Sequence, residues 1–325
     1  MRIAIVGAGG VGGTLAVRLC SAGHEVWISA RGEHAAAIRE HGLQLQGHDG
    51  LARTAPGAIQ LVGLGSAPAA PADLLVMAVK AFDLEEAMDG ARALLSPGTA
   101  VLPLQNGIDA AERLRARAPG ARVLGGSARV VASLEAPGVV RAATPLSLVL
   151  GALDPGDEAA VARAAEALAA PGVKVTLASD IRLQLWTKFL FICGVAGMTA
   201  ICRTPIGPVL AARESADMLE AIMREVESVA RARGISLPPD VTVEQLAFCR
   251  KMDPGAQSSM LGDLQRGKRL ELDHLNGAAV RFADESGVRA PCNRAVVAAL
   301  RPWADGAPAL APAPAPVPKA DNARP

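Results

Sequence analysis

Residues 3–12 read IAIVGAGGVG, and this stretch decides the fold of the chain. Its first four residues are apolar and mostly β-branched, as in a buried parallel strand. The pattern G-x-G-x-x-G follows at once, then a helical stretch that ends at Gly23 and a second apolar strand over 25–29. Strand, glycine turn, helix and strand in this order form a βαβ unit, which predicts a dinucleotide-binding domain.

Each glycine of the turn has its own physical task. Gly7 permits the tight turn, Gly9 lets the backbone approach a pyrophosphate, and Gly12 lets the helix pack closely on the strand. Free amides and the positive end of the helix dipole then attract the phosphates. A glycine-rich turn that binds nothing is the alternative. We expect the cofactor to contact the whole turn: Gly7, Ala8, Gly9, Gly10, Val11 and Gly12.

Arg31 indicates which dinucleotide binds. Sites that prefer NAD usually have a carboxylate near the end of the second strand, whereas an arginine suits the 2′-phosphate of NADP. The strand ends without Asp or Glu, and Glu33 lies two residues beyond Arg31. The sequence therefore predicts NADPH/NADP as cofactor. A solvated surface arginine is the alternative.

The composition excludes several classes of function. Apolar residues make up 50% of the 325, with three Trp, five Phe and no Tyr, so Ala, Leu and Val must fill the core. A net charge of +1 without basic clusters argues against nucleic acid and anionic membranes as partners. The apolar run Phe189–Cys202 is too short to span a bilayer. Five cysteines without C-x-x-C or metal-ligand spacing indicate reduced thiols in the cytoplasm and no metal site.

The pattern of elements divides the chain into three parts. Residues 1–178 alternate apolar strands with helical stretches, which predicts an α/β domain of the Rossmann type with a doubly wound sheet. Residues 179–304 show almost only helical pattern and form a second domain, for substrate and dimer contacts. An Ala/Pro-rich tail over 305–325 is expected to be disordered. The predicted helices of the second domain are 181–202, 215–233, 243–251, 259–275 and 278–285.

Two polar residues follow strands of the predicted sheet. Lys80 comes after the strand 74–79, and Asn106 after the strand 100–104. Ligands of such sheets bind beyond the carboxyl ends of the strands, so both side chains are placed near a cofactor. Lys80 could equally be a surface lysine, and Asn106-Gly107 an ordinary turn.

Lys188 is the unusual charge of the second domain. It is the only charged residue between Arg182 and Arg203, in a helix too apolar for the surface. Burial lowers the pKa of a lysine toward neutrality, where a general acid works best. Ile192 and Ala196 share its helix face and give it an apolar wall, as in a small-substrate pocket. A lysine that snorkels from a helix end is the alternative.

Taken together, these residues make the chain similar to the ketopantoate reductases (2-dehydropantoate 2-reductases). The resemblance spans residues 1 to about 303 and rests on the ensemble of pieces rather than on any one of them. It implies reduction of the 2-oxo group of 2-dehydropantoate to (R)-pantoate by NADPH. The matching pieces, in the order of the family, are Gly7-x-Gly9-x-x-Gly12, Arg31, Val79-Lys80-Ala81, Gln105-Asn106-Gly107, Trp186-x-Lys188, Ser258-Ser259-Met260-Leu261 and Glu271-Leu272-Asp273-x-x-Asn276-Gly277.

The resemblance also implies a role for each site residue. Lys188 would be the general acid, and Glu271 would bind the substrate or position Lys188. Ser259 would contact the substrate. Lys80 and Asn106 would lie by the nicotinamide ribose and the substrate, and Arg31 on the 2′-phosphate.

Two departures from the family pattern bear on the substrate and the cofactor. Two asparagines of the family that bind substrate hydroxyl groups are replaced here by Ile192 and Ala196. Methyl groups cannot discriminate for a hydroxyl by hydrogen bonding, so a less polar 2-oxo acid is an alternative substrate. Asp83 stands where the family can present a neutral partner to the 2′-phosphate, and would oppose Arg31.

Two other functions remain open at this point. A β-hydroxyacid dehydrogenase shares the dinucleotide domain, the helical second domain and a catalytic lysine. A non-catalytic NADPH sensor would need only the cofactor site. For the enzyme we expect a small-molecule 2-oxo acid as substrate and a homodimer formed through the helical domain.

Overall fold

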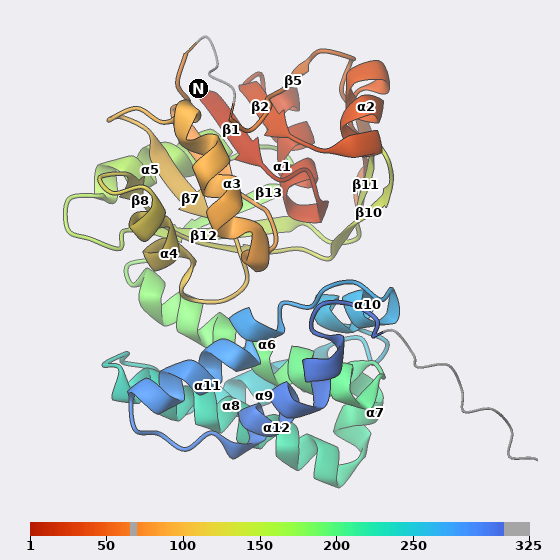
Figure 1. Ribbon diagram of the computed structural model, residues 1–325, viewed down its shortest axis with the longest axis vertical. Coiled ribbons are helices and arrows are strands. Elements are labelled where there is room, and N and C mark those ends of the chain that lie inside the picture. Colours follow the sequence, from red (N-terminus) through yellow and green to blue (C-terminus); the bar gives the residue numbers. More distant parts are fainter. Residues whose placement is uncertain (66–69, 309–325) are drawn as a thin grey trace, which may run out of the picture.

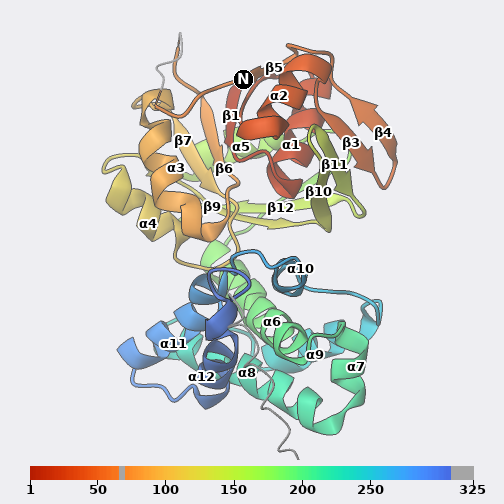
Figure 2. The same cartoon turned by 45° about the vertical axis from the view of Figure 1, so that its right-hand side comes forward.

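The computed structural model describes residues 1–65 and 70–308, and within them the chain forms two domains (Figure 1). An α/β domain comes first and a helical domain second. The first domain ends with strand β13 (Val173–Leu177), and the second begins with helix α6 (Ile181–Cys202). Figure 2 shows α6 running from the junction into the helical domain.

The α/β domain is built on a parallel sheet of six strands in the order β5-β2-β1-β6-β7-β8. The chain moves outward from β1 to one edge, returns to the other side of β1, and moves outward again. The point of reversal lies between β1 and β6, where a ligand of a doubly wound sheet binds. This confirms the predicted fold class. The strands are β1 (Arg2–Val6), β2 (Glu25–Ser29), β5 (Ile59–Leu61), β6 (Leu74–Met77), β7 (Ala100–Pro103) and β8 (Arg122–Val123).

Apolar side chains cover both faces of this sheet. Leu74, Leu75, Val76 and Met77 of β6 are all fully buried, because successive residues of a strand point to opposite faces and helices cover both. The covering helices are α1 (Gly10–Ser21), α2 (Gly32–His41), α3 (Leu84–Ala91), α4 (Ala110–Arg117) and α5 (Glu158–Leu168).

Two smaller sheets complete the first domain. One has the order β10-β11-β3-β4 and the other the order β13-β12-β9. The sequence analysis did not find β3, β4 or β5, since each has only three or four residues and little alternation. The strands are β3 (Gln44–Gly47), β4 (Gly50–Arg53), β9 (Gly125–Arg129), β10 (Ala132–Ala136), β11 (Val139–Ala142) and β12 (Leu146–Gly151).

The helical domain surrounds α6, whose bounds are those predicted. Asp180 caps its first turn by accepting a hydrogen bond from the amide of Leu183 at 3.0 Å. In the part of the chain that the structure describes, α6 is the one helix apolar and long enough for a membrane span, but 67% of its most apolar window is buried inside the protein. It is the core helix of this domain. The others are α7 (Ile206–Ala211), α8 (Arg213–Ala232), α9 (Val241–Lys251), α10 (Ser259–Gln265), α11 (Asn276–Glu285) and α12 (Pro291–Leu300).

The helix predicted over 259–275 was wrong. Helix α10 ends at Gln265, and Gly267 has a φ of +62°, a left-handed conformation that ends the helix. The next helical turn is the short 3-10 segment Leu272–His274. The interruption brings Glu271 to the domain junction instead of leaving it in the middle of a helix.

The predicted tail is described only in its first residues. Residues 309–325 lie outside the described part of the chain. Residues 305–308 stay close to the helical domain, where the amide of Ala307 donates to the carbonyl of Gly267 at 3.1 Å.

Candidate active site

The glycine turn between β1 and α1 has the geometry that its pattern predicts. Gly7 has a φ of +108°, and a Cβ there would lie 2.8 Å from the backbone of Ala78. A Cβ at Gly12 would lie 1.9 Å from the carbonyl oxygen of Gly7, so only glycine fits at either position. At Gly9 a Cβ would meet no atom within 4 Å. The backbone at Gly9 therefore faces open space, as contact with a pyrophosphate requires.

Gly10 has a further reason to be glycine, which the motif does not reveal. A Cβ at Gly10 would lie 2.6 Å from the carbonyl oxygen of Ala132 in β10. The hairpin of β10 and β11 thus packs directly on the first turn of α1. The glycine turn is held between this hairpin and the end of β6.

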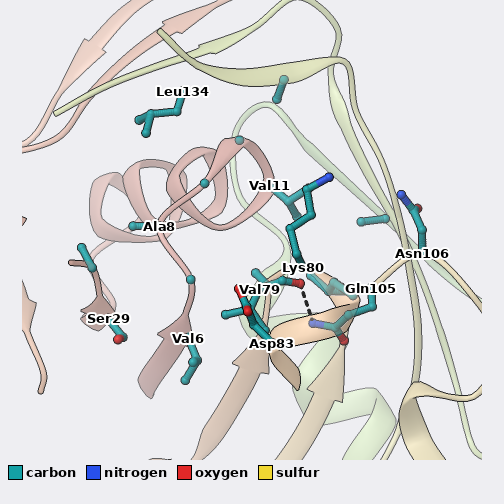
Figure 3. Close-up of a pocket in the computed structure, with 18 of the residues that line it drawn as sticks. Val6, Ala8, Val11, Ser29, Val79, Lys80, Asp83, Gln105, Asn106 and Leu134 are labelled. Atoms are coloured by element: carbon teal, nitrogen blue, oxygen red, sulfur yellow. Dashed lines mark hydrogen bonds between the residues drawn. The ribbon is translucent and has the colours of Figure 1, made fainter. Parts of the chain in front are cut away.

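A cavity of about 530 Å³ opens in front of the glycine turn. Its walls come from the carboxyl ends of β1, β2, β6 and β7, from β10, and from two residues of the helical domain, Ser259 and Glu271. Figure 3 shows Lys80, Gln105 and Asn106 beside the turn. The predicted residues that line the cavity are Gly7, Ala8, Gly9, Gly10, Val11, Arg31, Lys80, Asn106, Ser259 and Glu271.

Arg31 lies at the end of the cavity beyond β2. It occupies the N-cap of α2, and its guanidinium is 3.6 Å from the Glu86 carboxylate, with both side chains mostly exposed. Asp83 also lines the cavity, but the acidic group that pairs with Arg31 is Glu86. A weak, exposed ion pair of this kind leaves the guanidinium available to an anion.

Lys80 joins the two domains across the cavity. Its Nζ donates to the carboxylates of Asp263 at 2.8 Å and of Glu271 at 2.9 Å. The other oxygen of Glu271 accepts from the amide of Ala81 at 3.0 Å. Burial opposes the charged form of Lys80, but the charges of Glu271 and Asp263 outweigh it and raise the lysine pKa. Lys80 is therefore a permanent cation.

Lys188 has the opposite surroundings. Only 7% of it is exposed, and its Nζ donates to the carbonyl oxygen of Ala128 at 2.7 Å. Burial, and then the charge of Arg129, lower its pKa to about 8, while the charge of Glu271 opposes the shift. Ala128 lines the cavity, so the amine of Lys188 lies directly behind this part of the wall, bonded to its backbone. Lys188, Ile192 and Ala196 are not themselves among the residues that line the cavity.

The remaining predicted residues lie in different places. In the described part of the chain, the side-chain hydrogen bonds of Glu271 go to Lys80 and Ala81 and none goes to Lys188. Ile192 is partly buried and Ala196 is buried, both in the apolar core of the helical domain on the face of Lys188. Ser259 begins α10, directly after the N-cap Ser258.

Three residues of the site were not found from the sequence. Asp263 is buried and pairs with Lys80, Gln105 donates to the carbonyls of Met77 and Val79 at 2.9 and 3.1 Å, and His34 lines the cavity from α2. Gln105 was quoted only as part of a motif. A buried carboxylate inside an apolar helix face was the available signal for Asp263.

Among residues 1–65 and 70–308, no group of three or more His, Cys, Asp or Glu side chains could hold a metal ion. The fold and the cavity define a protein of the dinucleotide-binding class, with the glycine turn on one wall and polar groups of a second domain on the other.

Comparison with known proteins identifies the family. Residues 3–155 match the family described as Ketopantoate reductase PanE/ApbA, and residues 180–304 match Ketopantoate reductase PanE/ApbA C terminal. A 2-dehydropantoate 2-reductase of Halobacterium salinarum is 32% identical over 93% of this chain and 98% of its own length. The chain therefore belongs to the ketopantoate reductase family, as its motifs predicted.

Solved structures with the same fold include enzymes that are named for different substrates. A ketopantoate reductase of Ralstonia eutropha is 33% identical with a TM-score of 0.84, covering 94% of this chain and 98% of that one. A D-mandelate dehydrogenase, solved with NADH and anilino(oxo)acetate, is 27% identical with a TM-score of 0.86 and the same coverage. The structures similar to this chain thus include both a ketopantoate reductase and a D-mandelate dehydrogenase.

Proposed function

We propose that this protein reduces a 2-oxo acid to the 2-hydroxy acid with NADPH, and that its first candidate substrate is 2-dehydropantoate, giving (R)-pantoate. The observation that carries the proposal is Lys188, a buried amine that donates to the carbonyl of Ala128, a residue of the cavity in front of the glycine turn, and whose pKa is lowered to about 8. A group with this pKa exchanges a proton readily near neutral pH.

The cofactor, when bound along the glycine turn, supplies the hydride. Lys188 then has two tasks: its ammonium hydrogen-bonds the 2-oxo oxygen and transfers a proton to it as negative charge develops there. The carbonyl of Ala128 orients the amine, because its oxygen accepts a hydrogen bond from one of the three N–H groups of Lys188, with an Nζ···O distance of 2.7 Å. Lys80, Asn106 and Ser259 are proposed to hold the substrate in place.

Two features support NADPH over NADH. No carboxylate ends β2, and Arg31 at the N-cap of α2 lies where a 2′-phosphate would be bound. A 2′-phosphate held by Arg31 would also lie at the N-terminus of α2, whose dipole favours negative charge.

A less polar 2-oxo acid is the second candidate substrate. Ile192 and Ala196, on the face of Lys188, offer no hydrogen bond to a substrate hydroxyl. The similar D-mandelate dehydrogenase was solved with an aryl-substituted 2-oxo acid derivative, which supports an apolar substrate for this arrangement.

The test is loss of NADPH absorbance with 2-oxo acids of graded polarity. A clear preference for 2-dehydropantoate over deoxygenated analogues would support the first candidate and contradict the second. If the protein binds NADPH but reduces none of these acids, the result would contradict the proposed enzymatic activity and would support a non-catalytic NADPH sensor. We also expect a cytoplasmic homodimer, which size-exclusion chromatography with light scattering would check.

A further inference from the structure

His34 has an unusual place in the cofactor half of the cavity. It lies in the first turn of α2, three residues after Arg31, and is one of the residues that line the cavity. Its Nε2 is 2.9 Å from the carbonyl oxygen of Ala8, in the middle of the glycine turn. The amide of Gly138, in the turn between β10 and β11, donates to its Nδ1 at 2.9 Å.

These contacts join three segments that are far apart in the sequence. Gly138 has a φ of +76°, and a Cβ there would lie 3.1 Å from Ala37 of α2, so the hairpin turn packs directly on this helix. The same hairpin packs on the start of α1 through Gly10 and Ala132. His34 is the side chain that links the glycine turn, α2 and the hairpin by hydrogen bonds.

The two hydrogen bonds fix the protonation of the ring. Because a backbone amide can only donate, Nδ1 must be the unprotonated acceptor, and Nε2 therefore carries the proton given to Ala8. Burial lowers the pKa of His34, and the bond to Ala8 opposes this only in part. The neutral ring is accordingly the form present at neutral pH.

We propose that His34 is a positioning residue of the dinucleotide site: its neutral imidazole holds the glycine turn against the β10–β11 hairpin, and protonation of the ring weakens cofactor binding. A protonated Nδ1 would point an N–H at the N–H of Gly138, so that bond is lost. The hairpin and the turn would then separate at the surface on which the cofactor lies.

The charged groups on the segments around His34 do not replace this bond. Arg31 pairs with Glu86, and Glu135 of β10 is hydrogen-bonded to Ser133. Glu33 is the remaining charged group in the first turn of α2, Arg141 is the charged residue of β11 and is exposed, and the glycine turn carries no ionisable side chain.

The inference rests on dinucleotide binding at the glycine turn and not on the identity of the substrate. An imidazolium next to Arg31 could instead attract the 2′-phosphate, which would strengthen NADPH binding at low pH. The two possibilities predict opposite changes in dinucleotide affinity at low pH. NADH lacks the 2′-phosphate, so its pH dependence distinguishes them.

The experiment measures the Kd of NADH and of NADPH by calorimetry from about pH 7.5 to about pH 5, across the ordinary histidine pKa of about 6.5. We expect the wild-type Kd for NADH to rise about tenfold on acidification, the equivalent of one hydrogen bond. His34→Gln should bind NADH more weakly at pH 7.5 and show no such rise. His41→Gln, a change of an exposed histidine in the last turn of the same helix, should keep the wild-type profile.

Three results would overturn the proposal: a wild-type NADH affinity that does not change with pH, an unchanged rise in His34→Gln, or a gain in NADPH affinity alone at low pH. His34→Asn, whose amide oxygen can accept from Gly138, serves if the glutamine variant does not fold. It should likewise remove the rise. If the wild type binds neither dinucleotide at any pH, the cofactor assignment itself fails, which is a distinct result.

Discussion

Two lysines, one from each domain, make hydrogen bonds across the domain junction, and their surroundings are opposite. Lys80, after β6, is 40% exposed and pairs with two buried carboxylates, which raise its pKa. Lys188, on α6, is buried against a backbone carbonyl, and its pKa is lowered to about 8. The side chains are chemically identical, so the difference comes from the neighbours alone.

The comparison teaches which lysine can transfer a proton. Lys80 keeps its charge throughout the physiological range and can only attract, orient and link the domains. Lys188 gains and loses a proton near neutral pH, because burial disfavours its charged form and no carboxylate is hydrogen-bonded to it in the described part of the chain. Changes at Lys188 and Lys80 test this division, and changes at Arg31 and Ile192 test the proposed cofactor and substrate contacts around it.

The largest effect is expected for Lys188→Ala. Removal of the proton donor should lower kcat by about 10²- to 10⁴-fold with little change in the Kd for NADPH. Steady-state kinetics and calorimetry measure the two quantities. Near-normal turnover in this variant would show that Lys188 is not the proton donor and would contradict the proposed difference in role between the two lysines.

The next largest effect is expected for Lys80→Met, and it concerns the free energy of unfolding. The change leaves Glu271, with its side chain 6% exposed, without its cation, and leaves Asp263, 9% exposed, paired only with Arg266 at 3.0 Å. Breaking a fully buried pair costs about 3–5 kcal/mol, and partial exposure of Lys80 reduces the expected loss to about 1–3 kcal/mol.

Chemical denaturation measures this loss in free energy of unfolding. A matched variant, Lys80→Met with Asp263→Asn and Glu271→Gln, removes both carboxylate charges that have lost Lys80 and should recover most of the lost stability. A loss that persists in the triple variant would show that packing, rather than charge, is what Lys80 contributes.

A smaller and purely local effect is expected for Arg31→Ala. Loss of a charge-assisted contact with the 2′-phosphate should raise the Kd for NADPH about tenfold and leave the Kd for NADH nearly unchanged. Arg39→Ala, on the same helix but outside the cavity lining, is the control. Equal weakening of both dinucleotides would contradict the phosphate contact.

The specificity test changes the face of α6 that carries Lys188. Ile192→Asn should shift the ratio of kcat/KM toward hydroxyl-bearing 2-oxo acids by a factor of about ten, one hydrogen bond gained by the substrate. Ile192→Leu, which keeps an apolar side chain, should leave the ratio unchanged. If both variants behave alike, residue 192 does not contact the distal part of the substrate.

The cofactor wall was predictable from the sequence because its determinants are local. The glycine turn, β1 and α1 lie within a few residues of one another, so spacing alone specifies their geometry. Lys80 and Asn106 were placed at strand ends by the topology of the sheet. The packing of Ala132 on Gly10 could not be read in this way, since it joins residues far apart in the chain.

The opposite wall was predictable only in part. The apolar setting of Lys188 was visible as an isolated charge in a helix, whereas its partner, the carbonyl of Ala128, is a backbone atom without a residue-specific signal. The break after Gln265 was missed because the helical periodicity on both sides of Gly267 continues across it. That break directs Glu271 to Lys80.

The most direct test of the division between the two lysines is the pH dependence of kcat/KM, which reports the ionisations of the free enzyme. An acid must be protonated to act, so the wild-type value should be constant below the pKa of Lys188 and fall as pH rises above about 8. Lys188→Arg, which stays charged, should be slower and lose this inflection, while Lys80→Met should keep it. An inflection that survives in Lys188→Arg would contradict the account.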